Sequence, residues 1–299
     1  MGRLKNKIYS YLFQFVSDRI KKELLREVTF QVSKRFLLEY NDPETMRQLI
    51  QSQRYKRAIR PVLYDVPEAD NILIYAPHED DETIGAGGTI LKCVEHGKRV
   101  KTIYVTDGAT SIKQTRQDTG IRKEEARKVW EYIGGEPPQF WDLPCRQIPL
   151  TEETAATMRK QIEENVTECI FVPFFLEPPL DHRRVNQLLL MAHRIKPLPE
   201  AIQIWSYQVS SMLCPNVMID ITTLIDKKDS INNIWESQNA FFNYAHYARG
   251  MAAYNSIYLP KEHNTSPQKR YVELFFVAHP EEYIGLINNY FESEPNGNK

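Results

Sequence analysis

The chain has 299 residues, of which 42% are hydrophobic and 11% aromatic, with a net charge of −1 and four cysteines that form no CxxC pair. This length and apolar content predict one main domain with an appendage. The charge balance argues against nucleic-acid binding, and the isolated cysteines argue against a disulfide framework, so we expect a cytoplasmic protein. No run approaches the roughly 18 apolar residues of a membrane span.

The first part of the chain differs from the rest in charge. Residues 1–60 contain 14 Lys or Arg and 6 Asp or Glu, a balance of +8 that leaves −9 for the remainder. Within residues 1–28, apolar side chains recur every three or four positions, as in an amphipathic helix, and most basic side chains fall outside this stripe. We therefore expect a basic helical extension over residues 1–65. Its apolar stripe packs on its own domain, joins subunits of a homo-oligomer, or lies peripherally on an anionic membrane surface.

From residue 71 onward, short β-prone runs alternate with helical patterns. The expected strands are 71–76, 100–108, 140–143, 168–175 and 217–222, and helical patterns cover 85–97, 121–135 and 183–193. This alternation predicts an α/β fold with a largely parallel sheet, in which ligands bind beyond the carboxyl ends of the strands. We expect the main domain to span residues 66–290 and residues 291–299 to form a loose tail.

One imidazole and four carboxylates follow the first of these strands, in APHEDDETIGAGGT (His78, Glu79, Asp80, Asp81 and Glu82). Adjacent carboxylates repel one another and no turn requires them, so a cation is expected nearby. His78 and Asp81, three positions apart on a tight turn, can ligate one ion, and His182 follows another strand and emerges at the same sheet edge. A His, Asp and His set leaves a position for water, as in a catalytic metal site, and Asp80 can then act as general base.

These motifs resemble a known family. PHEDDETIGAGG is similar to the PHPDDE signature of the LmbE-like, or PIG-L-like, zinc-dependent N-acetylglucosaminyl de-N-acetylases, and PLDHRRV is similar to the family's second motif, HPDH. The resemblance covers about residues 71–280. It implies a Rossmann-like three-layer sandwich that binds Zn²⁺, although such sites also accept Fe²⁺ and other divalent metals. It also implies roles for single residues: metal ligands (His78, Asp81 and His182), a general base (Asp80) and a substrate-contacting arginine (Arg122).

Two positions depart from the family pattern. Glu79 stands where the family usually has proline, which predicts a simple change of turn. Pro179 stands where the family has the first histidine of HPDH, a residue linked to oxyanion stabilisation or leaving-group protonation. Either Asp80 then serves as both base and acid, or Arg183 or Glu177 from the nearby loop replaces the imidazole.

The expected activity is removal of the N-acetyl group from an N-acetylglucosamine-type sugar or glycoconjugate in a biosynthetic pathway. The alternative is a catalytically weak metal- or sugar-binding relative that acts as a scaffold in a glycan biosynthetic complex, which Pro179 favours and the complete ligand set opposes. Two simpler interpretations concern single motifs. GAGG could form a dinucleotide-binding loop, although the preceding acids would repel a pyrophosphate, and His182 could be a surface or helix-capping residue.

Overall fold

Eight strands form one sheet in this computed structural model, which describes residues 61–109, 116–211, 213–260 and 269–293. The strands are β1 (Val62–Tyr64), β2 (Asn71–Ala76), β3 (Arg99–Thr106), β4 (Gln139–Leu143), β5 (Cys169–Pro173), β6 (Gln203–Tyr207), β7 (Val217–Asp220) and β8 (Val272–Ala278). Their order is β1-β7-β8-β6-β5-β2-β3-β4. All neighbours are parallel except β8, which is antiparallel to β6 and β7. The predicted, largely parallel α/β sheet is confirmed.

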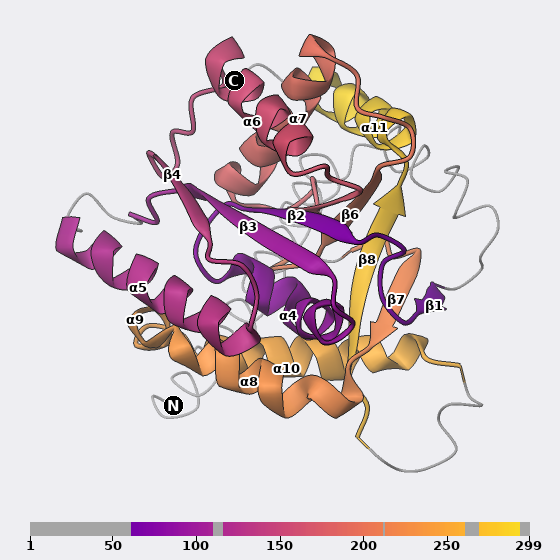
Figure 1. Cartoon of the computed structure of the whole chain (residues 1–299). Coiled ribbons are helices and arrows are strands. Elements are labelled where there is room, and N and C mark those ends of the chain that lie inside the picture. Colours follow the sequence, from indigo (N-terminus) through magenta and orange to yellow (C-terminus); the bar gives the residue numbers. More distant parts are fainter. Residues whose placement is uncertain (1–60, 110–115, 212, 261–268, 294–299) are drawn as a thin grey trace, which may run out of the picture.

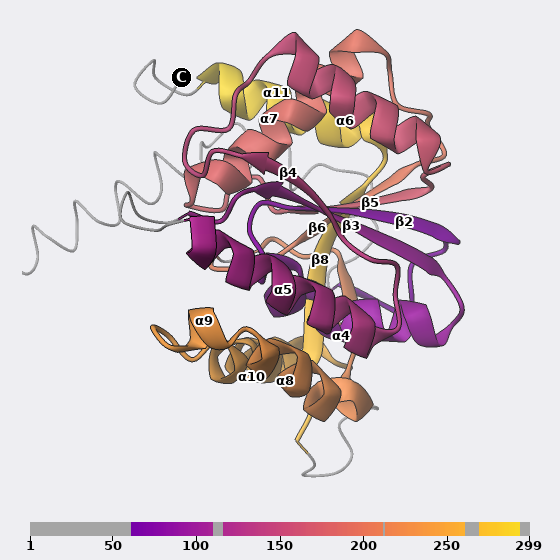
Figure 2. The same cartoon turned by 60° about the vertical axis from the view of Figure 1, so that its left-hand side comes forward.

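Helices cover both faces of the sheet, so the fold has the predicted three layers (Figures 1 and 2). One face carries α6 (Glu152–Glu164), α7 (Leu180–Ile195) and α11 (Pro280–Ser293), and the other carries α4 (Asp81–Glu95), α5 (Arg116–Ile133), α8 (Ile225–Ile234), the short α9 (Glu236–Asn239) and α10 (Tyr244–Asn255). Alternate strand residues enter the two cores: Leu73 of β2 packs in one and Ile74 in the other. Burial on both faces explains why these strands appear as continuous apolar runs in the sequence.

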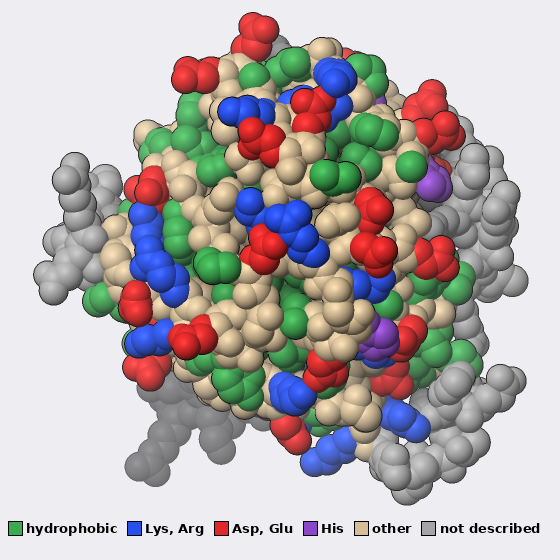
Figure 3. All heavy atoms as spheres, viewed as in Figure 1, with side chains coloured by type: hydrophobic (Ala, Val, Ile, Leu, Met, Phe, Trp, Pro, Cys, Tyr) green, Lys and Arg blue, Asp and Glu red, His purple; other side chains and the backbone are tan. Residues whose placement is uncertain are grey.

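Several predicted boundaries lie at the ends of the described chain. The predictions for residues 1–60, including the amphipathic helix over 1–28, fall outside the described residues. β1 lies in the range assigned to the extension, and α11 continues to Ser293, in the range assigned to the tail. The division into extension, domain and tail stays a prediction. No helix among the described residues is long and apolar enough to span a bilayer, and basic and acidic side chains are intermixed on the face shown in Figure 3.

The glycine cluster after β2 lies inside a helix. GAGG occupies positions 85–88 of α4, so the interpretation as a dinucleotide-binding loop is wrong. The glycines permit close packing: a Cβ atom on Gly85 would lie 2.4 Å from the Gln208 carbonyl oxygen, and one on Gly88 would lie 2.7 Å from Cγ2 of Ile221. Both separations are shorter than side-chain contacts allow, so α4 can approach these segments only with glycine at these positions.

A buried ion pair anchors α4 to the sheet and to α8. The Lys228 ammonium of α8 lies 2.6 Å from Oε1 of Glu273 on β8 and donates to the Ile84 carbonyl oxygen. The Glu273 carboxylate also accepts hydrogen bonds from the backbone N–H groups of Gly88 and Thr89. Both charged side chains are almost fully buried. The ion pair and its hydrogen bonds therefore join α4, α8 and β8, which are distant from one another in the sequence.

We predict that Lys228→Met lowers the free energy of unfolding by about 3 kcal/mol, because the Glu273 carboxylate would remain buried without its cation. Urea unfolding at pH 7 measures the change. The matched control is Lys227→Met, since the Lys227 ammonium pairs with Glu95 at the exposed surface, where water screens the two charges, and its loss should leave the urea midpoint nearly unchanged. Equal losses in the two variants would contradict the anchoring role of the buried pair.

Candidate active site

A pocket of about 600 Å³ opens where several parallel strands end. The turn after β2 contributes His78, Asp80 and Asp81, and α7, which follows β5, contributes His182. In the sheet, β2 lies between β3 and β5. The chain passes from β2 to β3 on one side, and a later crossover brings it to β5 on the other side. Ligands of parallel α/β sheets bind at such switch points. The position of this pocket therefore agrees with the location expected from the sequence.

The three predicted metal ligands come together in this pocket. Oδ2 of Asp81 lies 3.1 Å from Nδ1 of His78 and 3.3 Å from Nε2 of His182. The backbone N–H of His78 donates to the same oxygen. Ligand atoms of the three residues all lie within 4.8 Å of one another. Two imidazoles and a carboxylate from separate segments thus surround a volume that one ion can occupy.

The charges around this cluster favour a cation. Burial lowers the pKa of His78, but the Asp81 and Asp181 side chains outweigh it and hold this pKa well above its usual value. Burial raises the pKa of Asp81, yet His182 and His78 outweigh that effect and hold the pKa below its usual range. The site therefore stabilises positive charge between its carboxylates. Nitrogen and oxygen donors of this kind suit Zn²⁺ and Fe²⁺, so the residues present fit a divalent metal.

A second set of donors shares His78. Nε2 of His78 lies 3.0 Å from Oδ2 of Asp181, and Sγ of Cys145 lies 3.3 Å from the same oxygen. The backbone N–H of Arg146 donates to both oxygens of Asp181. Asp181 is thus held by several donors and orients the His78 ring, as carboxylates commonly do for ligand histidines. Cys145, which follows β4, has no motif around it, and the sequence analysis missed it.

Asp80 has an unusual backbone conformation. Its φ of 134° and ψ of −29° lie in a region that non-glycine residues rarely adopt, at a cost of about 1–3 kcal/mol. The Asp80 carbonyl oxygen accepts the N–H groups of Thr83 and Ile84, which fixes the turn. Burial raises the pKa of Asp80 to about 7, while the Arg122 guanidinium opposes that shift. The adjacent carboxyl groups of Asp80 and Asp81 thus have pKa values displaced in opposite directions, as in pairs that divide acid–base roles.

The other two acids of the motif do not line the pocket. Glu79 is fully buried, and its Oε2 lies 3.2 Å from Nε of Arg122. Arg122 also donates to the carbonyl oxygens of Gly108 and Glu79, and its Nη2 lies 3.8 Å from Oδ2 of Asp80. Glu79 therefore does more than change the turn, because it fixes the arginine beside Asp80. Glu82 accepts a hydrogen bond from the Tyr104 hydroxyl inside the core.

Glu177 and Arg183, the two residues expected from the sequence to replace the missing imidazole, do not line the pocket. Glu177 is buried, and its carboxylate accepts hydrogen bonds from the backbone N–H groups of Val209 and Ser210. Arg183 is buried on α7 and is also absent from the pocket lining. Glu177 instead fixes the loop after β6, which supplies one side of the pocket.

An aromatic cluster completes the pocket on the side of α10. Phe242, Tyr244 and Tyr247 all line it, and the Phe242 ring lies 5.1 Å and 5.8 Å from the Tyr244 and Tyr247 rings between centroids. The sequence analysis missed these residues. The aromatic run FFNYAHY at positions 241–247 could have indicated an aromatic pocket wall. No spacing or motif in the sequence, however, places this run near His78 or His182.

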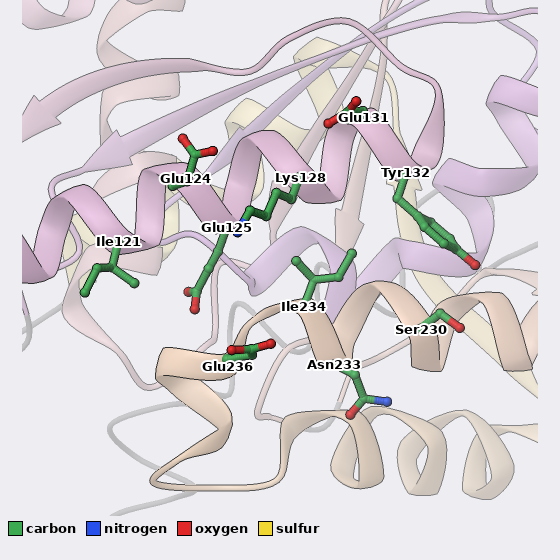
Figure 4. Close-up of a pocket in the computed structure, with 10 residues that line it drawn as sticks. All are labelled: Ile121, Glu124, Glu125, Lys128, Glu131, Tyr132, Ser230, Asn233, Ile234 and Glu236. Carbon is green, nitrogen blue, oxygen red and sulfur yellow. The ribbon is translucent and has the colours of Figure 1, made fainter.

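A larger cleft of about 740 Å³ lies between α5 and α8 (Figure 4). Glu124, Glu125 and Lys128 project from α5, and Asn233 and Ile234 lie on α8. Its lining contains none of the predicted site residues, and Glu125 is engaged by the backbone and hydroxyl of Ser237. The chemistry-bearing side chains are gathered in the smaller pocket.

The family predicted from the motifs matches the central part of the chain. The family model described as GlcNAc-PI de-N-acetylase (PIG-L) matches residues 73–193, from β2 through most of α7. The resemblance is confirmed over this range. It contains all five predicted site residues. The diacetylchitobiose deacetylase of Thermococcus kodakarensis is 25% identical over 191 residues, which cover 57% of this chain and 71% of that protein.

Solved structures confirm the fold. The N,N'-diacetylchitobiose deacetylase of Pyrococcus horikoshii superposes with a TM-score of 0.61 at 23% identity and covers 72% of this chain and 86% of its own. The 4-carboxy-2-hydroxymuconate hydratase of Pseudomonas putida superposes with a TM-score of 0.56 at 17% identity, over 70% of this chain and 96% of its own. Because one architecture occurs in a deacetylase and in a hydratase, the fold alone does not identify the reaction.

We predict about one divalent metal ion per chain, and loss of that ion in both Asp81→Ala and His182→Ala, because two remaining ligands rarely hold such an ion. Elemental analysis after gel filtration measures the content. Cys145→Ser is the control, because Cys145 belongs only to the second set of donors, with His78 and Asp181. This variant should keep the metal. Metal lost from Cys145→Ser but kept in His182→Ala would assign the ion to His78, Cys145 and Asp181 instead.

Proposed function

We propose that the protein is a metal-dependent hydrolase that removes the N-acetyl group from an N-acetylglucosamine-type sugar or glycoconjugate in a biosynthetic pathway. The observation that carries this proposal is the placement of Asp80 beside the convergent His78, Asp81 and His182 in one open pocket. All four residues lie within the PIG-L match. The sugar deacetylase activity named for the Thermococcus relative supports the substrate class.

We assign His78, Asp81 and His182 as the metal ligands, with Zn²⁺ as the expected ion and Fe²⁺ as an alternative. A divalent ion bound there supplies Lewis acidity that activates water and polarises the acetamide carbonyl. Asp181 fixes the orientation of the His78 ring through the contact between its Oδ2 and Nε2 of His78. His182 reaches the same centre from α7, so the ligand set depends on the packing of α7 against the β2 turn.

Asp80 acts as the general base. It takes the proton from the attacking water and returns it to the nitrogen as the C–N bond breaks, which releases acetate and a free amine. Arg122 lies 3.8 Å from the Asp80 carboxylate, and Glu79 and Gly108 fix its guanidinium. These contacts make Arg122 a positioning residue for Asp80. We also propose that Arg122, which lines the pocket, contacts the substrate.

The scaffold alternative is not favoured. A binding protein would not require a complete ligand set with an additional strained carboxylate beside it, and backbone strain of this kind is typical of functional sites. We further propose a cytoplasmic location. Residues 1–28 would supply the contact with a second subunit or with a membrane surface, as their amphipathic pattern suggests.

We predict that the purified, metal-loaded protein releases acetate and free amine in equal amounts from N-acetylated aminosugars. N-acetylglucosamine, diacetylchitobiose and an N-acetylglucosaminyl glycoside form a suitable panel, with acetate measured enzymatically. Chelation should abolish the release, and added metal should restore it, because the ion activates the attacking water. Absence of acetate from every member of the panel, with metal bound, would overturn the proposed function.

The role of Asp80 has its own test. Asp80→Asn should keep the metal and lose at least about 10² in kcat, because the base is lost while the ligands remain. Glu82→Gln replaces a neighbouring buried carboxyl group that does not line the pocket and should stay within about tenfold of wild type. An Asp80→Asn variant that keeps the wild-type rate would show that another group is the base.

A further inference from the structure

The proposed reaction needs a hydrogen-bond donor that the second motif does not supply. Attack on an acetamide places negative charge on the carbonyl oxygen, and enzymes stabilise that charge with donors aimed at it. Pro179 lines the pocket at the N-cap of α7 and has neither a side-chain donor nor a backbone N–H. A donor that adds to the polarising effect of a bound ion would come from another part of the pocket.

Most hydroxyl groups of the pocket are already engaged. The Ser210 hydroxyl donates to Oε2 of Glu177 at 2.6 Å. The Tyr247 hydroxyl donates to the Val209 carbonyl oxygen at 2.8 Å. Gln238 donates from Nε2 to the Ser237 hydroxyl at 3.1 Å. These contacts hold the walls of the pocket together, and the two hydroxyl groups have no further proton to offer a substrate.

The Tyr244 hydroxyl differs from the others. Tyr244 is the first residue of α10 and lines the pocket at intermediate exposure. Its hydroxyl has no hydrogen-bond partner among the described residues, although its backbone N–H donates to Oδ1 of Asn239 at 2.9 Å. Together with the edge-on contact to the Phe242 ring, this hydrogen bond fixes the residue. Tyr244 therefore presents a positioned donor that the protein itself does not use.

The charges of the site act on this hydroxyl. Burial raises the pKa of Tyr244, and the carboxylates of Asp80 and Asp81 raise it further. The hydroxyl thus keeps its proton and can donate a hydrogen bond at neutral pH. Tyr244 lines the same pocket as Asp80 and Asp81.

We propose that Tyr244 is a further catalytic residue, whose hydroxyl donates a hydrogen bond to the acetamide carbonyl oxygen as that oxygen becomes negatively charged. This inference rests on the proposed function. The water oxygen forms the new bond to the carbonyl carbon, the C–N bond breaks, and the proton passes from water through Asp80 to the leaving nitrogen. Tyr244 keeps its own proton throughout. Asp80 then needs to handle only the proton, and the oxyanion contact comes from a segment outside both motifs.

The first experiment compares Tyr244→Phe with Tyr254→Phe in the full-length, metal-loaded protein. Loss of an oxyanion donor should lower kcat by about 10²-fold with KM changed by less than about threefold, because the hydrogen bond forms mainly in the transition state. Tyr254→Phe removes an exposed hydroxyl near the other end of the same helix, outside the pocket lining, and it should stay within about tenfold of wild type. Metal content and the urea midpoint should match wild type in Tyr244→Phe.

The second experiment measures binding without turnover. A methylphosphonamide analogue of N-acetylglucosamine carries a tetrahedral centre with negatively charged oxygens, whereas glucosamine has no such group. In calorimetry, Tyr244→Phe should bind the analogue about 10²-fold more weakly than wild type and bind glucosamine equally well. A structural defect would instead weaken both ligands, and that result would overturn the catalytic role.

The remaining outcomes separate the two proposals. Wild-type protein that releases acetate, with Tyr244→Phe at full kcat and full analogue affinity, would overturn the role of Tyr244 and leave the proposed function intact. A loss of about 10²-fold in Gln238→Leu, with Tyr244→Phe unaffected, would assign the contact to the second N–H of that amide. Wild-type protein without acetate release from any substrate would overturn the function itself.

Discussion

The site depends on one buried carboxylate oxygen. Oδ2 of Asp81 receives the His78 backbone N–H and lies within reach of both imidazoles, one from the β2 turn and one from α7. A carboxylate removed from water is stable only when positive charge or several donors compensate it. His78 and His182 supply that compensation. The packing of α7 contributes to this compensation, because without it the buried charge of Asp81 would lose the His182 imidazole.

The position of Asp81 in turn depends on α4. Asp81 is the first residue of this helix, and the favourable N-terminal dipole adds to the stability of its negative charge. The glycines at 85 and 88 allow α4 to pack closely, and Glu273 holds the next turn through the N–H groups of Gly88 and Thr89. The buried Lys228 neutralises Glu273. The glycines of the motif thus serve helix packing, and of the acids that precede them Asp80 and Asp81 line the pocket.

The sequence predicted the parts of the site that follow from strand order. Parallel strands end at one edge of a sheet, so His78 after β2 and His182 after β5 could be placed together without coordinates. It did not predict β6 or β8, although both are central, because IWSY and VELFFVA have the same apolar character as buried helices. It also missed Cys145 and Tyr244. These residues reach the pocket through tertiary packing, which no local spacing encodes.

The four adjacent acids show why sequence position alone does not assign roles. Their side chains leave the chain in different directions: Glu79 reaches a buried guanidinium, Glu82 reaches a core tyrosine, and Asp80 and Asp81 face the pocket. Only the surroundings distinguish them chemically, since aspartate and glutamate side chains have nearly the same pKa in water. The same reasoning applies to Pro179. The pocket is formed by segments more than 150 residues apart in the sequence, from His78 to Tyr247. It can therefore obtain a hydrogen-bond donor from any of them, so a missing histidine in one motif removes only one source of that donor.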